Sequence, residues 1–226
     1  CGICTVSPQG PNRLGYWCVG RFRMGAKTAR TARRIGSALA CAAAMTLSGL
    51  ALSGHANAEP DPPPLPVFIP GPTDWSPNTD IWEYHTFTYQ WTPEMISGMS
   101  DSCQWFNAQF DPLMGQINNF NNNLADQHDD YSAGGVQRQA NGVVANIDQS
   151  TAFLGPRVQP LTITNNLNNF GPYSPLYGGE QITTVTYQLT RIAEGIREQK
   201  PAGVIHANIV AAQVGGNLLR DLGACN

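Results

Sequence analysis

The chain has 226 residues, of which 42% are hydrophobic and 13% charged, and this fits one globular domain with appended segments. Residues 59–226 hold all 16 acidic residues but only six of the 13 Lys and Arg, so this part has a formal net charge of −10. Because nucleic acids and anionic lipids bind to clustered cations, this charge argues against either of them as its partner.

Residues 24–58 have the pattern of a secretory signal. A basic stretch from Lys27 to Arg34 precedes an apolar run, Ile35 to Leu52, and the small-residue motif Ala56-Asn57-Ala58 follows. These parts in this order predict export, with cleavage before Glu59. We therefore expect a secreted protein or one of the extracytoplasmic cell envelope, with membrane contact only through the signal before cleavage.

Two alternatives for this segment are a transmembrane helix and a lipoprotein signal ending at Cys41. The apolar run is interrupted by Ser37, Thr46 and Ser48, which suits a signal better than a membrane span, and few apolar residues precede Cys41. Residues 1–23 show no periodicity, and we interpret them as a non-native upstream segment.

Residues 59–92 are predicted to form a proline-rich linker and an aromatic arm. Eight prolines from Pro60 to Pro77 block helix formation and favour an extended chain, so we expect a spacer. A proline-rich ligand for an aromatic groove is the alternative. The arm either covers the domain or meets a partner, and its candidate contact residues are Trp75, Trp82, Tyr84 and Trp91.

Residues 93–226 carry helical periodicity and are predicted to form the folded domain. The first segment has apolar residues at alternating spacings of three and four, which is the seam of an amphipathic helix: Ile96, Met99, Cys103, Phe106, Phe110, Leu113, Ile117, Phe120 and Leu124. Pro112 interrupts this segment, and we expect two helices that meet at a kink there.

Three further segments continue the pattern. Their apolar positions are Val136, Ala140, Val143, Ile147, Ser150, Leu154 and Val158; then Ile182, Val185, Leu189, Ile192 and Ile196; then a broad face of Val204, Ile205, Ile209, Val210, Val214, Leu218, Leu219 and Leu222. The last segment also has a row of small residues, which we attribute to close helix packing: Gly203, Ala207, Ala211 and Gly215.

Four amphipathic segments with mainly short connections predict an all-α, antiparallel four-helix bundle with the proline-rich extension at its N-terminus. Removal of the signal leaves two cysteines in an exported chain, Cys103 and Cys225. In an up-down-up-down order the last helix returns to the level where the first begins, so we expect these two cysteines to form a disulfide.

The residues after the signal show no catalytic constellation. Three histidines remain and no Glu-x-x-His pair occurs, so a di-iron carboxylate site lacks its signature. The most polar cluster, His128-Asp129-Asp130, lies at an expected helix–helix turn, where we interpret it as a solvated cap in preference to a metal site. We assign no catalytic residue, no metal and no cofactor.

The layout of residues 24–77 resembles small exported proteins of mycobacteria and related actinobacteria, many of them of unknown function. The resemblance lies in the Ala-rich basic signal, His55-Ala56-Asn57-Ala58 and Glu59-Pro60-Asp61-Pro62-Pro63-Pro64, about a quarter of the chain. It implies export. Some such proteins are helical and carry haem, but no residue here matches a haem motif.

The sequence favours a non-enzymatic interaction or structural module whose partner is an envelope protein or a glycan. The alternative is a carrier of an apolar small molecule, a lipid or a haem-like group, in the bundle core. Phe106, Phe110, Met114 and Phe120 suggest it.

Overall fold

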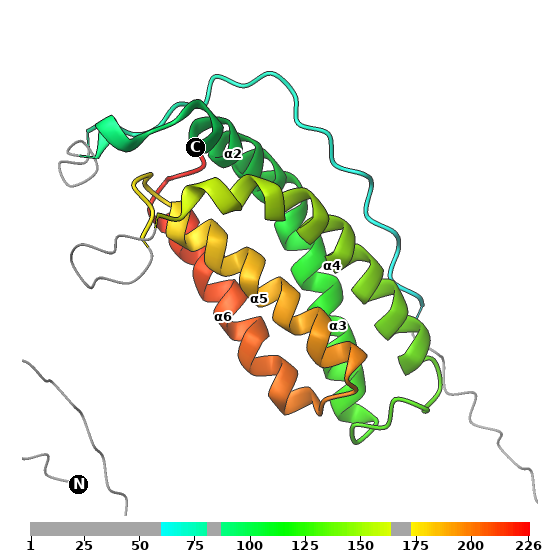
Figure 1. Ribbon diagram of the computed structural model, residues 1–226. Helices are drawn as coiled ribbons and strands as arrows, with labels where there is room; N and C mark the ends of the chain where they lie inside the picture. The colour runs from blue at the N-terminus through cyan, green and yellow to red at the C-terminus, as the bar shows by residue number, and fades with distance from the viewer. Residues whose placement is uncertain (1–59, 81–86, 164–172) are drawn as a thin grey trace, which may run out of the picture. The chain divides into compact units, whose positions relative to one another are not determined.

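The computed structural model describes residues 60–80, 87–163 and 173–226. The upstream segment, the signal with its cleavage site, and Trp82 and Tyr84 of the arm lie outside the described residues. The described part is a bundle of four antiparallel helices, as the sequence predicts (Figure 1). Short 3-10 turns precede and interrupt it, η1 (Thr88–Gln90) and η3 (Gln159–Leu161).

The first helix of the bundle is one continuous run of three segments: α2 (Pro93–Trp105), a π-helical turn η2 (Phe106–Phe110) and α3 (Asp111–Asp126). The Thr92 hydroxyl caps its start by accepting the Met95 amide at 3.2 Å. The interruption expected at Pro112 takes the form of the π turn. A wider turn removes the clash between a proline ring and the carbonyl four residues before it, so the helix continues.

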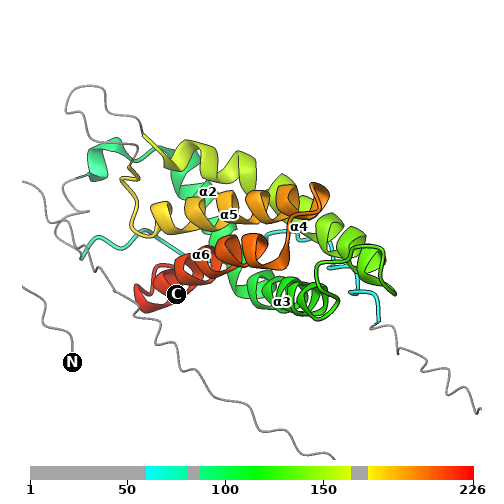
Figure 2. The same cartoon turned by 90° about the horizontal axis from the view of Figure 1, so that it is seen from below.

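The other three helices are α4 (Val136–Val158), α5 (Gly179–Arg197) and α6 (Ala202–Asp221). All seam positions predicted for α4 and α5 are at most 7% exposed. The helix α4 packs against α5 and against both α2 and α3 of the first helix, and α6 packs against α5 and the α3 part of the first helix (Figure 2). The apolar periodicity of α4 and α5 therefore correctly predicts which of their residues are buried in the core.

Two glycines let the helices approach closely. A Cβ at Gly98 of α2 would lie 2.3 Å from the Arg157 carbonyl oxygen of α4, and one at Gly216 of α6 would lie 2.4 Å from the Phe110 ring. Both distances are far below van der Waals contact. These positions fix how near α4 comes to α2 and how near α6 comes to the first helix.

The expected disulfide joins Cys103 of α2 to Cys225, with the Cα atoms 4.9 Å apart. Gly223 ends α6 in the left-handed region with φ +60°, where glycine has no steric cost, and so turns the chain back toward α2. The indole nitrogen of Trp75 donates to the Ala224 carbonyl at 2.9 Å. The first helix, the last helix and the N-terminal extension thus meet at one end of the bundle.

Residues 60–77 do not form the spacer that the sequence predicts. They lie along the bundle, as the cyan trace beside α4 in Figure 1 shows, and we call them the strap. Amide side chains of the first helix bind successive strap groups, since Gln116 and Gln109 donate to the Pro63 and Pro66 carbonyls and Gln104 accepts from the Gly71 amide. The strap therefore runs antiparallel to the first helix.

The central clamp on the strap is Asn146 of α4, which is 4% exposed. Its Oδ1 accepts the Leu65 amide at 3.0 Å and its Nδ2 donates to the Pro63 carbonyl at 3.1 Å. One turn later, Gln149 donates to the Leu65 and Pro66 carbonyls. Leu65 itself is 8% exposed and belongs to the hydrophobic core.

The chemistry of the strap explains why amides hold it. An extended proline-rich chain has no internal hydrogen bonds, and its prolines lack N–H groups, so it offers mainly carbonyl acceptors. Asn and Gln side chains supply two donors and an acceptor group each, without the desolvation cost of a charge. The strap is thus matched to an amide-lined groove between α4 and the first helix.

We expect removal of the disulfide to destabilise the fold strongly. The bond closes a loop with a sequence separation of 122 residues, for which the loss of chain entropy in the unfolded state corresponds to about 4–5 kcal/mol. Urea unfolding of the oxidised protein, the reduced protein and a Cys103→Ala/Cys225→Ala variant measures this. The reduced protein and the variant should agree with each other, and a loss below about 1 kcal/mol in both contradicts the entropic account.

The strap makes a matched pair of glycine substitutions informative. A Cβ at Gly142 of α4 would lie 2.7 Å from Cγ of Pro62, whereas Gly115 of α3 has nothing within 4 Å of its Cβ position. We expect Gly142→Ala to displace the strap and speed hydrogen exchange of the Leu65 amide. We expect Gly115→Ala to leave that exchange unchanged and to stabilise the helix by about 0.5–1 kcal/mol. Equal exchange in the two variants contradicts the observed strap packing.

Candidate functional site

Two residues of the predicted aromatic contact surface lie on the bundle. The half-buried Trp75 donates its indole N–H to the Ala224 carbonyl, and Trp91 donates to the Pro175 carbonyl, both at 2.9 Å. Both side chains pack against the core. In the described residues, therefore, the arm covers the domain at these two positions, while Trp82 and Tyr84 lie outside what the structure describes.

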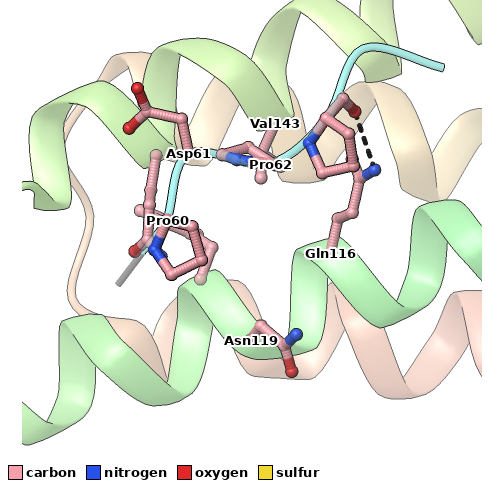
Figure 3. A pocket seen from close by; sticks show the side chains of 9 residues that line it. Pro60, Asp61, Pro62, Gln116, Asn119 and Val143 are labelled. Carbon is pink, nitrogen blue, oxygen red and sulfur yellow. Dashed lines mark hydrogen bonds between the residues drawn. The ribbon is translucent and has the colours of Figure 1, made fainter. Parts of the chain in front are cut away.

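A small cavity of about 140 Å³ lies under the beginning of the strap (Figure 3). Pro60, Asp61 and Pro62 form one wall, and Gln116 and Asn119 of α3 face them across the space. The cavity is smaller than the roughly 300–1,000 Å³ typical of small-molecule sites. Its lining of prolines and amides, with Phe120 and Val143, belongs to the strap groove.

The aromatic residues that suggested a carrier are packed in the core. Phe106, Phe110, Met114 and Phe120 are each at most 4% exposed. The rings of Phe106 and Phe110 lie 4.7 Å apart between centroids, and Trp105 packs edge-on against Phe110 at 6.5 Å. The Phe106 and Phe110 rings lie against the Gly216 position of α6, and Phe120 packs beside Tyr131.

The polar cluster at the turn between α3 and α4 caps another helix, which differs from the solvated cap that the sequence predicts. Asp129, with φ +64°, accepts the Ala202 amide at 2.7 Å and so caps the N-terminus of α6 from another loop. The Ser132 hydroxyl and amide donate to Asp130 and lower its pKa below the ordinary value. The Tyr131 hydroxyl donates to the Lys200 carbonyl at 2.9 Å. The turn therefore fixes where α6 begins.

The most unusual surface is on α6. The broad apolar face expected there is only partly core: Ile205, Ile209 and Leu219 are fully buried, whereas Val204, Val210, Val214 and Leu218 are 52%, 41%, 52% and 43% exposed. We call the outward stripe the outer face of α6; it consists of Gly203, Val204, Ala207, Val210, Ala211, Val214 and Leu218.

The prediction that the row of small residues on α6 serves close helix packing holds for only part of the row. Gly215 packs inside the bundle, where a Cβ would lie 3.1 Å from Val185 of α5. Gly203, by contrast, has nothing within 4 Å of its Cβ position, and Ala207 is exposed. The N-terminal part of the row therefore belongs to the outer face and not to packing within the bundle.

The outer face is uncharged as well as apolar. Residues 202–219 contain no Lys, Arg, Asp or Glu, whereas the neighbouring α5 exposes Glu180, Arg191 and Arg197. Soluble helices normally turn such a polar face to water. Two charged residues flank the outer face, Lys200 before α6 and Asp221 at its last position.

Comparison of the chain with protein-family models, curated proteins and solved structures gave no match. Within the described ranges, no helix has the length and hydropathy needed to cross a membrane. The same ranges contain no group of three or more His, Cys, Asp and Glu residues arranged to hold a metal ion. The outer face of α6 is the candidate site because Val204, Val210, Val214 and Leu218 are large apolar side chains exposed along one helix.

The cap that positions α6 has a pH signature. Burial, together with the nearby negative charge of Asp129, raises the pKa of Tyr131 to about 12, from 10.0 in the unfolded chain. Between these two values the folded protein binds one more proton than the unfolded chain, so stability falls as the pH rises through this window. We expect Tyr131→Phe to flatten the slope of unfolding free energy between pH 10 and 12, measured by urea unfolding. An unchanged slope contradicts this role, whatever the variant's stability at neutral pH.

Proposed function

We propose that the protein is an exported, non-enzymatic interaction module of the cell envelope or the extracellular medium, and that its contact surface is the outer face of α6. The observation that carries the proposal is that an apolar, uncharged stripe faces outward along the whole of α6. Contiguous exposed apolar surface is typical of interaction sites, and His206 and Asn217 are exposed beside this stripe. The bundle buries one side of α6, so the other side is left for a partner.

The outer face is held in place before any partner arrives. Its helix is capped by Asp129 at the N-terminus, is close-packed on Phe110 through Gly216, and continues to the disulfide at Cys225. Preorganised surfaces lose less conformational entropy when they bind. This arrangement supports a contact role in which α6 does not have to move.

Two further features support the exported location. The basic stretch, apolar run and Ala56-Asn57-Ala58 motif have the order of a secretory signal. The disulfide between Cys103 and Cys225 is of the kind that persists in oxidising compartments. The resemblance to small exported actinobacterial proteins is consistent with both.

The aromatic arm is a second proposed contact surface, for an envelope protein or a glycan. Trp75 and Trp91 use their indole N–H groups on the domain, so Trp82 and Tyr84 would carry most of this contact. For the alternative carrier function, the packed Phe106, Phe110 and Phe120 offer no support.

Site-specific photo-crosslinking in the producing cells tests the proposal. We expect p-benzoylphenylalanine in place of Val210, on the outer face, to give a protein adduct of defined mass. The matched control replaces Ala145, which is exposed on α4, and should give none. Absence of an adduct at Val210, or equal labelling at both positions, contradicts a contact role for the outer face.

A further inference from the structure

We infer that the occupant of the outer face is a second copy of this chain, paired through two antiparallel α6 helices about a two-fold axis. This inference rests on the proposed contact role of α6 and adds the identity of the partner. The order of side-chain sizes along the helix and the charges at its ends both favour this pairing.

Apart from Val204, the outer face is small at its N-terminal end and large at its C-terminal end. Gly203 and Ala207 come first, Val210 and Ala211 lie at the centre, and Val214 and Leu218 come last. Positions four residues apart lie on one side of a helix. The stripe therefore presents a shallow half followed by a raised half.

An antiparallel pair centred between Val210 and Ala211 matches these halves. In this register Gly203 lies opposite Leu218 of the second copy, Ala207 opposite Val214, and Val210 opposite Ala211. These three facing pairs each join a small residue to a larger one, which favours entry of the side chains of one helix into the grooves of another, and Val204 lies opposite Asn217. A parallel pair in register sets Leu218 against Leu218 and Gly203 against Gly203, with crowding at one end and a gap at the other.

The charges agree with the same register. It places Asp221 of one copy next to Lys200 of the other, beside the α6 N-terminus that Asp129 already caps. Within its own chain Asp221 is exposed in the last turn of α6, where the helix dipole disfavours a negative charge, and its neighbour Arg220 is already paired with Asp111. Lys200 contacts Glu198 at 3.2 Å and is 47% exposed, so its ammonium group can contact a second carboxylate.

A two-fold axis also satisfies the requirement that one surface be complementary to itself. The interface is limited to one helix face and so is smaller than the roughly 800 Å² per partner of standard complexes. We therefore expect a reversible dimer, half-formed at a concentration on the order of 10–100 µM, and not an obligate one.

A size-exchange experiment tests the pairing. Sedimentation velocity of the oxidised protein, as isolated from the producing cells, measures the dissociation constant of the wild type and three variants. We expect Ala207→Val to weaken the dimer at least tenfold by crowding Val214 of the second copy, and Val214→Ala to weaken it by leaving a gap. In the double variant, Ala207→Val with Val214→Ala, the large residue stands at position 207 and the small one at position 214. This again pairs a small residue with a large one and should recover most of the affinity. Both positions are exposed, so the thermal unfolding midpoint of each variant should stay within a few degrees of the wild type.

The outcomes separate this inference from the proposed function. A protein that stays monomeric at 1 mM, or a dimer that neither single variant weakens, overturns the antiparallel pairing. A monomer whose Val210 crosslinks to a different protein overturns the pairing and leaves the contact role intact. Sedimentation of the monomer with phosphatidylglycerol vesicles, abolished by Val210→Asn, would assign the face to lipid and overturn both.

Discussion

The position of α6 depends on its attachment at both ends, and the rest of the structure depends on that position. At one end the Cys103–Cys225 bond ties the chain end to α2, and at the other Asp129 caps the helix from the α3–α4 turn. Between them the close contact of Gly216 with Phe110 sets the depth of packing. With these three points fixed, α6 completes the core with one side and must show the other side to its surroundings.

The bundle could be predicted from the sequence because one physical rule dominates it. Apolar side chains at spacings of three and four make an amphipathic helix with one apolar face that is buried. The seams of α4 and α5 are buried as that rule requires. The disulfide followed from the antiparallel order of the helices. Seam spacing does not show how Pro112 is accommodated, because the seam residues from Met99 to Leu124 stay buried through the π turn, whereas Ile96 at the start of the seam is only half-buried.

The strap could not be predicted by the same rule, since it is held by hydrogen bonds and not by a periodic apolar face. Proline density correctly indicates an extended chain, but says nothing of what lies beside it. The signal that was present is on α4, where Arg138, Gly142, Asn146, Gln149 and Phe153 recur at helical spacing beside the apolar seam. The outer face was missed for a different reason: α6 is apolar on both sides, so its pattern cannot show which side meets the core.

We expect α6 to be a rigid part of the core whose outer face is formed before any partner binds. Native-state hydrogen exchange on the dilute, oxidised protein tests this most directly, with the α6 amides compared with those of Leu189 and Ile192 in α5. We expect the amides of Ile209, on the core side, and Val210, on the outer face, to exchange only through global unfolding. Their free energy of opening should equal that of the α5 amides. Exchange of the whole of α6 through a local opening several kcal/mol below the global value would contradict it.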